Sequence, residues 1–156
     1  MPAWHEFETV APALAQVGRR LFADRGGEAL LATVKSADAP RIHPVNVGIV
    51  DGHLYTFIIG SSPKRVDLES DGRYAIHSHV DPIAPSEFSV RGHSSLVEDV
   101  SLRSSVGSQW PFSVDESYYL FELFVETAIL GERSTADEWP PRYSSWKGGQ
   151  NAAAGS

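Results

Sequence analysis

Residues 41–65, RIHPVNVGIVDGHLYTFIIGSSPKR, contain the signals that decide the fold. Asp51-Gly52 is a strong hairpin signal, because both central positions of a two-residue β-turn favour positive φ. The turn separates two segments with strand character, Arg41–Val50 and His53–Ile59. Pro44 has no N–H to donate to a strand ladder, so we expect an irregular or edge position near it. The stretch therefore predicts an antiparallel hairpin with one imperfect strand.

A short helix is predicted directly after this hairpin. Ser62 is a plausible N-cap and Pro63 is favoured at the first helical position, so we expect a helix over residues 62–70. Val66 and Leu68 are expected to face the interior of the protein.

The rest of the chain adds strands more often than helices. Two segments read as helices: residues 11–24, an amphipathic pattern ended by Gly26-Gly27, and Val100–Trp110. Four more read as strands: Ala29–Lys35, Arg73–Val80, Glu87–Asp99 and Tyr118–Leu130. Gly92 lies inside the third strand and indicates a bulge or bend. About six strands without a βαβ alternation predict a mainly β fold with a few short helices, arranged as a small antiparallel barrel.

The composition narrows the class of protein. The chain has 156 residues, which suggests one domain, and 42% of them are apolar. Its net charge of −7 argues against nucleic acid or an anionic membrane as a partner, because both select basic surfaces. The lack of cysteine excludes disulfides, thiolate metal sites and a Cys nucleophile, and fits a cytoplasmic protein. We find no signal peptide and no apolar run of the roughly 20 residues that a transmembrane helix needs.

Three cations gather around the predicted hairpin despite the acidic background. Arg41 begins the first strand, and Lys64 and Arg65 follow the N-cap of the short helix. A helix N-terminus offers free backbone N–H groups and the positive end of the helix dipole. Further hydroxyl donors come from Ser61, Ser62 and the Tyr55-Thr56 pair. The combination is competent to bind a phosphate group; the alternative is a capped surface helix with solvated Lys and Arg.

Several motifs occur in an order known from one family. They are Pro40-Arg41-Ile42-His43-Pro44-Val45, Asp51-Gly52, Tyr55-Thr56, Ser62-Pro63-Lys64, Asp71-Gly72-Arg73-Tyr74-Ala75-Ile76 and Val90-Arg91-Gly92-His93 continuing to Val97-Glu98-Asp99. Over about residues 10–130 the chain resembles the pyridoxamine 5′-phosphate oxidase-like, FMN-binding split β-barrel family. The resemblance implies a six-stranded antiparallel split β-barrel over residues 1–131, with an N-terminal helix and a bound flavin. Residues 132–156 would form a partly disordered tail, with disorder at Asn151–Ser156.

The resemblance also implies a function. The protein would be a homodimeric flavoprotein that transfers hydride to or from a small organic molecule, with FMN held between the subunits. Arg41, Ser62 and Lys64 would hold the flavin phosphate, with Thr56 near the phosphate chain or ring. Residues 43–46 would line the isoalloxazine edge through backbone groups. The complete set of cofactor-binding candidates is Arg41, His43, Pro44, Val45, Asn46, Tyr55, Thr56, Ser61, Ser62, Lys64 and Arg65; no catalytic residue is assigned.

Two departures from the family pattern bear on the substrate. Asn46 stands where pyridoxamine phosphate oxidases have a Lys, and the C-terminal Arg-x-His motif of those enzymes is missing. Both point away from vitamin B6 and toward the broader flavin or deazaflavin (F420) reductases. F420 is the alternative cofactor, but its polyglutamate tail would need additional basic residues. The chain has few of these, which favours FMN.

A non-enzymatic protein is the alternative from another class. A split barrel of this kind could store or sense flavin or haem, with His43, His77 or His93 as an iron ligand. His77 and His79 share a strand face and could form a metal site with His93. No acidic residue joins them at convincing spacing, so no metal is predicted.

Tryptophans occur in the loops and in the tail. Trp110 and Trp139 are each followed by Pro and read as loop residues. Trp146, on the Gly-rich tail, is the candidate for an aromatic side chain that caps the flavin ring across a dimer.

Overall fold

Strands dominate residues 1–149, the part of the chain that the computed structural model describes. The elements in chain order are α1 (Trp4–Val10), α2 (Pro12–Ala23), the 3-10 turn η1 (Asp24–Gly27), β1 (Glu28–Thr33), β2 (Arg41–Val50), β3 (His53–Ile59), α3 (Pro63–Ser70), β4 (Arg73–Ser78), β5 (Glu87–Leu96), α4 (Val100–Ser108), β6 (Tyr118–Leu123), β7 (Thr127–Glu132) and β8 (Arg142–Lys147). The disorder predicted for Asn151–Ser156 lies outside the described residues.

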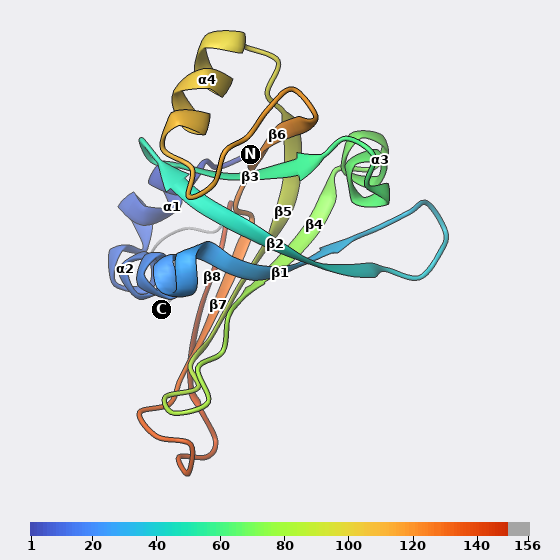
Figure 1. The fold of residues 1–156 in the computed structure, drawn as a ribbon. Coiled ribbons are helices and arrows are strands. Elements are labelled where there is room, and N and C mark those ends of the chain that lie inside the picture. The colour runs from blue at the N-terminus through green and yellow to red at the C-terminus, as the bar shows by residue number, and fades with distance from the viewer. Residues whose placement is uncertain (150–156) are drawn as a thin grey trace.

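Six strands close into an antiparallel barrel. Neighbouring strands pair in the order β4-β1-β2-β3-β6-β5, and β4 pairs with β5 to complete the ring. β7 and β8 continue the sheet beyond β5 and run into a long extension below the barrel (Figure 1). The predicted fold class, a mainly β six-stranded antiparallel split barrel with a few short helices, is confirmed.

The barrel is split because β2 and β5 each serve two sheets. Residues 41–46 of β2 pair with β1, whereas residues 47–50 pair with β3. In the same way, residues 87–93 of β5 pair with β4 or β7, and residues 94–96 pair with β6. Within residues 1–149, no strand pairs with the second edge of residues 41–46, which confirms the edge position predicted near Pro44.

The turn between β2 and β3 is the predicted two-residue hairpin. Val50 and His53 lie opposite each other, which leaves only Asp51 and Gly52 in the loop. Their φ angles are 49° and 80°, so both central residues have the positive φ that this turn requires. Both strands of the hairpin have the predicted boundaries.

One predicted strand, Tyr118–Leu130, is wrong, because the chain turns a corner between β6 and β7. The corner passes over β5 beside Gly92, where the Phe124 N–H donates to the His93 carbonyl at 2.9 Å. A Cβ atom on Gly92 would lie 2.0 Å from the Phe124 carbonyl oxygen, so the crossing requires glycine. The bend predicted at Gly92 coincides with the point at which β5 passes from one sheet to the other.

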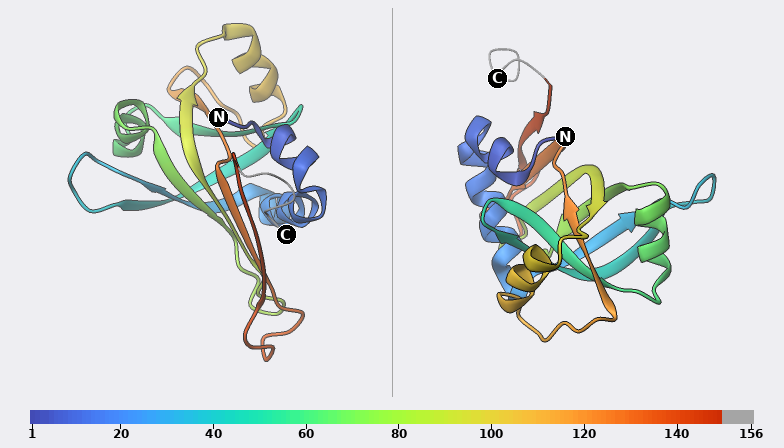
Figure 2. Two further views of the ribbon diagram at one scale, coloured as in Figure 1. Left: turned by 180° about the vertical axis from the view of Figure 1, so that it is seen from behind. Right: turned by 90° about the horizontal axis from the view of Figure 1, so that it is seen from above.

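α1 and α2 cover one side of the barrel (Figure 2) and bury an aromatic cluster there. Trp4 and Phe7 of α1 are fully buried, and Phe22 of α2 lies with its ring centroid 5.1 Å from that of Phe88 in β5. The sequence pattern predicts α2 but not α1, because α1 has only 7 residues and two buried side chains. Among residues 1–149, no helix combines the length and apolar character that a membrane span requires.

The tail contains a strand that the sequence does not predict. β8 pairs with β7 along its whole length. Trp146 belongs to β8, and its ring centroid lies 5.0 Å from that of Phe7, so this side chain packs within its own chain. Trp110 is buried, with its ring centroid 5.0 Å from that of Phe57, whereas Trp139 is exposed. The proposed ring-capping role of Trp146 therefore conflicts with its packing against α1.

Candidate anion-binding site

The start of β2 and the short helix α3 lie next to each other beside the split in the barrel. An ion pair between Arg41 and Asp67 joins the two elements. α3 begins as predicted: Pro63 is its first residue, and the Ser62 Oγ accepts the Lys64 N–H at 3.4 Å. Pro63 has no N–H, and the Arg65 N–H donates to the Ser62 carbonyl at 3.1 Å, so Ser62 accepts both N–H groups at the start of α3.

The face that α3 turns toward the barrel differs from the predicted one. Residues at i, i+3 and i+4 share a helix face, which groups Lys64 with Asp67 and Leu68. Leu68 is buried as expected, but Val66 is 51% exposed, so its predicted inward orientation is wrong. Residues two positions apart on a helix point in different directions, so Val66 and Leu68 cannot both face the core. The same helical periodicity is the signal in the sequence that could have identified Asp67.

Arg41 is paired with a carboxylate that the sequence analysis does not single out. Its Nη2 donates to Asp67 Oδ1 at 2.9 Å. Thr33, the last residue of β1, donates its hydroxyl to Asp67 Oδ2 at 2.8 Å, and His43 Nε2 lies 3.5 Å from the same hydroxyl. The Asp67 side chain is fully buried, whereas that of Arg41 is 33% exposed. A buried carboxylate with donors on both oxygens therefore offsets much of the Arg41 charge.

Arg65 is also engaged within the chain. Its Nε donates to the Gly60 carbonyl at 2.8 Å, and its Nη1 donates to Glu69 at the same distance. The guanidinium carbon lies 5.0 Å from the centroid of the Tyr119 ring. These contacts anchor α3 to the end of β3 and to β6, and they leave Arg65 little freedom to move toward a ligand.

Lys64 is the third predicted cation and differs from the other two. Within residues 1–149 its ammonium group forms no ion pair and donates no hydrogen bond, although the residue is only partly exposed. Burial lowers the pKa of Lys64 from its ordinary value. Burial also lowers the pKa of His43, with smaller contributions from Lys64 and Arg41 in the same direction and an opposing one from Asp67. The His43 imidazole is therefore mainly neutral at neutral pH.

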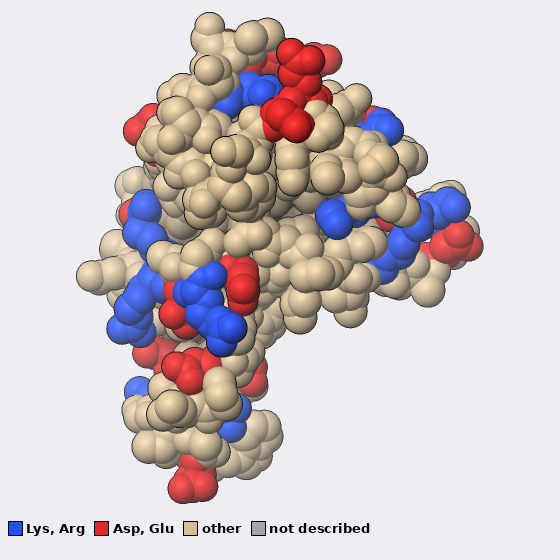
Figure 3. All heavy atoms as spheres, in the orientation of Figure 1, with Lys and Arg blue, Asp and Glu red and all other residues tan. Residues whose placement is uncertain are grey.

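The surface charges around this site are mixed. On the face shown in Figure 3, blue Lys and Arg atoms near α3 and the loop between β1 and β2 are accompanied by red Asp and Glu atoms. The candidate anion site is therefore local and does not belong to a broad basic surface on this face.

The other predicted residues lie nearby and make different contacts. The Thr56 hydroxyl is buried and donates to the Asn46 carbonyl at 2.8 Å. The Asn46 side chain donates to the Gly26 carbonyl at 3.0 Å. Tyr55 is buried in a second core cluster, and Ser61 is exposed in the loop before α3. Arg41, His43, Ser62 and Lys64 therefore form the group that the structure brings together.

Pro44 and Val45 line a separate hollow of about 380 Å³. The other side of this hollow includes Leu30 of β1 and His77 and Ser78 of β4. The Ser78 hydroxyl is buried without a hydrogen-bond partner in the described part of the chain. The hollow therefore brings two predicted residues into contact with solvent on the side of β2 that pairs with β1.

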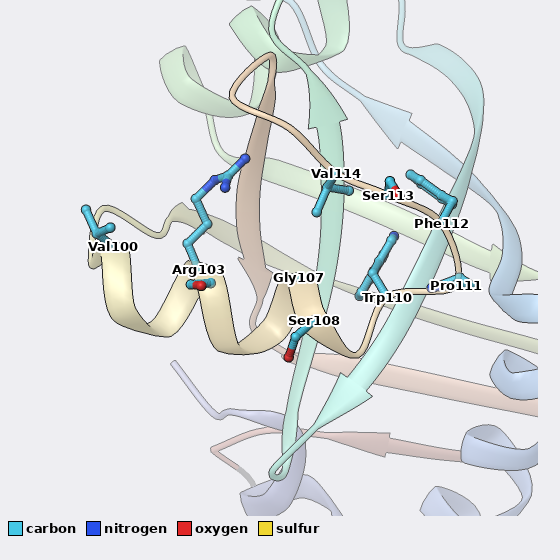
Figure 4. A pocket seen from close by; sticks show the side chains of 10 residues that line it. Val100, Arg103, Gly107, Ser108, Trp110, Pro111, Phe112, Ser113 and Val114 are labelled. Carbon is cyan, nitrogen blue, oxygen red and sulfur yellow. The ribbon is translucent and has the colours of Figure 1, made fainter.

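A larger cavity, of about 750 Å³, lies between α4 and the segment that follows it (Figure 4). Its lining includes Arg103 and Trp110 but none of the predicted cofactor-binding residues. Arg103 donates to the carbonyl groups of Asp115 and Tyr118, and thus holds the segment against α4. This cavity is independent of the group around Lys64.

The histidines considered as metal ligands make ordinary hydrogen bonds. His93 Nδ1 lies 2.7 Å from a Glu126 carboxylate oxygen, and His77 Nδ1 lies 2.7 Å from the Ser78 carbonyl oxygen. In residues 1–149, no three His, Asp or Glu side chains are grouped so that they could hold a metal ion.

The fold is similar to those of several solved structures. A pyridoxamine 5′-phosphate oxidase-related, FMN binding protein from Nostoc punctiforme aligns with a TM-score of 0.62 at 15% identity, over 88% of this chain and 95% of that chain. A protein from Clostridium acetobutylicum that is related to general stress protein 26, of the pyridoxinephosphate oxidase family, aligns with a TM-score of 0.62 at 12% identity. The alignment covers 85% of this chain and 92% of that chain. A heme binding protein from Mycobacterium smegmatis aligns with a TM-score of 0.61 at 17% identity, over 86% of this chain and 58% of that chain. No protein-family model and no curated protein matches the sequence.

Proposed function

Because the chain has the split-barrel fold of the pyridoxamine 5′-phosphate oxidase-like proteins, we propose that it is an FMN-dependent oxidoreductase acting on a small organic molecule. The observation that carries the proposal is the Lys64 ammonium group. It is partly buried, has no partner within residues 1–149 and lies at the N-terminus of a capped helix. A cation held in this way is stabilised by an anion, and the phosphate of FMN is an anion of suitable size.

The residues present fit a flavin phosphate. The Lys64 ammonium group can donate to phosphate oxygens, and the positive end of the α3 dipole favours an anion beside it. Arg41 uses Nη2 for Asp67, and a guanidinium has further N–H donors on its other nitrogens. The unpaired edge of residues 41–46 offers backbone hydrogen-bonding groups to a planar ring. Donors for the phosphate and for the ring thus occur on the same strand and on the adjacent helix.

When bound, FMN supplies the hydride-transfer chemistry. The residues of the chain bind and orient it: Lys64 supplies the uncompensated positive charge for the phosphate, Arg41 donates its remaining N–H groups, and the β2 edge sets the position of the ring. The neutral imidazole of His43 can accept or donate one hydrogen bond beside the phosphate. We assign no proton transfer to a side chain.

We also propose that the cofactor lies between two copies of the chain. The outer face of β1 and β2 supports this arrangement, because Leu30 is 52% exposed and Ile42 70% exposed there. Their strand partners on the same face are Pro44 and Ala32, so this part of the face is apolar, whereas the next pair along it is Glu28 and Asn46. A second copy would remove this face from water. Light scattering after size exclusion should give twice the monomer mass, and Ile42→Asp should give monomers that bind FMN weakly; a monomeric wild type that binds FMN would contradict the arrangement.

Reconstitution tests the cofactor assignment. FMN, F420 and haemin are each titrated into the purified protein, and binding is followed by fluorescence quenching or by absorbance. Riboflavin is the matched ligand that lacks the phosphate. We expect FMN to bind more tightly than riboflavin, and bound FMN to be reduced by NADH or NADPH. Binding of haemin alone would support the non-enzymatic alternative, and failure of every flavin to bind would refute the proposal.

A further inference from the structure

We propose that Asp67 determines how strongly this site distinguishes a phosphomonoester from a phosphodiester, an inference that rests on the proposed function. The argument begins with the cations. In residues 1–149, Arg41 is paired with Asp67 and Arg65 with Glu69, whereas Lys64 has no carboxylate partner. A ligand phosphate therefore meets one uncompensated cation and one that is already neutralised.

Asp67 competes with a ligand for Arg41. Its side chain is fully shielded from water, and both of its oxygens hold donors, from Arg41 at 2.9 Å and from Thr33 at 2.8 Å. Coulomb interactions weaken with distance and with the surrounding dielectric, so a buried charge in direct contact acts strongly. At a phosphate bound on the exposed side of Arg41, the field of Asp67 cancels much of the field of the guanidinium.

The two classes of ester differ in the charge that they bring to this site. A phosphomonoester such as FMN carries about −1.5 to −2 at neutral pH, judged by the second pKa of other phosphomonoesters. A phosphodiester, such as the one in F420, carries a single negative charge. Because Asp67 offsets the charge of Arg41, the additional negative charge of the monoester adds little binding free energy at Arg41 in the wild type. Removal of the Asp67 charge should therefore strengthen binding of the monoester more than binding of the diester.

Asp67→Asn tests this inference, with Glu69→Gln as the matched control. Both residues lie on α3 and both changes remove one negative charge, but Glu69 is paired with Arg65 and not with Arg41. Each variant is titrated with FMN, F420 and riboflavin. We expect D67N to lower the Kd for FMN about tenfold and the Kd for F420 about threefold. The Kd for riboflavin should change less than about twofold. We expect E69Q to change the Kd of each of the three ligands by less than about twofold.

The double variant R41Q/D67N shows whether Asp67 acts on the ligand by its charge. Electrostatic potentials add, so relative to Arg41→Gln alone the added change at Asp67 should again strengthen binding of FMN about tenfold and of F420 about threefold. Loss of this effect in the absence of Arg41, an equal effect of E69Q, or an unchanged ratio of FMN to F420 affinity would overturn the inference.

A comparison of FMN and riboflavin binding to the wild-type protein tests the same inference without any variant. FMN should bind no more than about a hundredfold more tightly than riboflavin, as expected for one uncompensated cation. A preference above about a thousandfold would require both cations and would overturn the inference. If FMN binds in a way that depends on Lys64 but not on Asp67, only this inference fails. If the wild type binds neither FMN nor F420, the proposed function fails and this inference with it.

Discussion

Replacing Lys64 with alanine should weaken FMN binding by a factor between about 10 and about 150. Two opposite unit charges about 4 Å apart attract by about 4 kcal/mol at an effective dielectric of about 20. Lys64 is only partly buried, so solvent screens part of this attraction. Charge-assisted hydrogen bonds contribute about 1.5–3 kcal/mol, and every 1.4 kcal/mol corresponds to about tenfold in Kd. Riboflavin lacks the phosphate, so its binding should not change.

Fluorescence titration at fixed salt concentration measures this effect, with two control variants. Lys64→Arg keeps the charge and should retain FMN affinity within about fivefold. Arg65→Ala removes a neighbouring cation that is already held by Gly60 and Glu69, so FMN affinity should change less than about threefold. The reasoning is refuted if K64A binds FMN within twofold of the wild type, or if K64A weakens riboflavin as much as FMN.

Three further predictions concern stability and pH. Gly92→Ala should lower the free energy of unfolding by about 2–3 kcal/mol in urea titration, because the new Cβ would meet the Phe124 carbonyl; a change below about 0.5 kcal/mol would show that the corner can relax. Ser78→Ala should raise the free energy of unfolding by about 1 kcal/mol, because it removes a buried hydroxyl without a partner, and a decrease would contradict this. FMN affinity should fall as pH rises through the lowered pKa of Lys64, while the K64R variant keeps its charge and its affinity to higher pH; identical pH profiles would exclude this role for Lys64.

Local chemistry made the central hairpin predictable. Asp51-Gly52 specifies its turn by backbone preference alone, and Ser62 with Pro63 specifies the start of α3, so these elements lie where the sequence places them. The corner after β6 is different. Residues 118–130 have strand propensity throughout, and the glycine that permits the corner lies on β5, far away in sequence. Only the closed barrel brings Gly92 and the corner together.

The candidate site was predictable in its residue types but not in its charge balance. The sequence shows the cations Arg41, Lys64 and Arg65, yet which of them are neutralised depends on tertiary contacts. The partner of Arg41 is Asp67 on α3, 26 residues later in the chain, a contact that the sequence alone does not specify. The partner of Arg65, Glu69, lies four residues later on the same helix and could have been identified by its spacing.

The strands shared by the two sheets have a consequence for how the protein unfolds. β2 and β5 each hydrogen-bond to both sheets, so the loss of one sheet would break the ladder along part of a strand that the other sheet needs. The barrel should therefore melt as one cooperative unit, with the slowest-exchanging amides of both sheets reporting the same global opening. Since the proposed ligand edge belongs to one of these shared strands, a ligand bound there would slow amide exchange on the far side of the barrel as well as beside it.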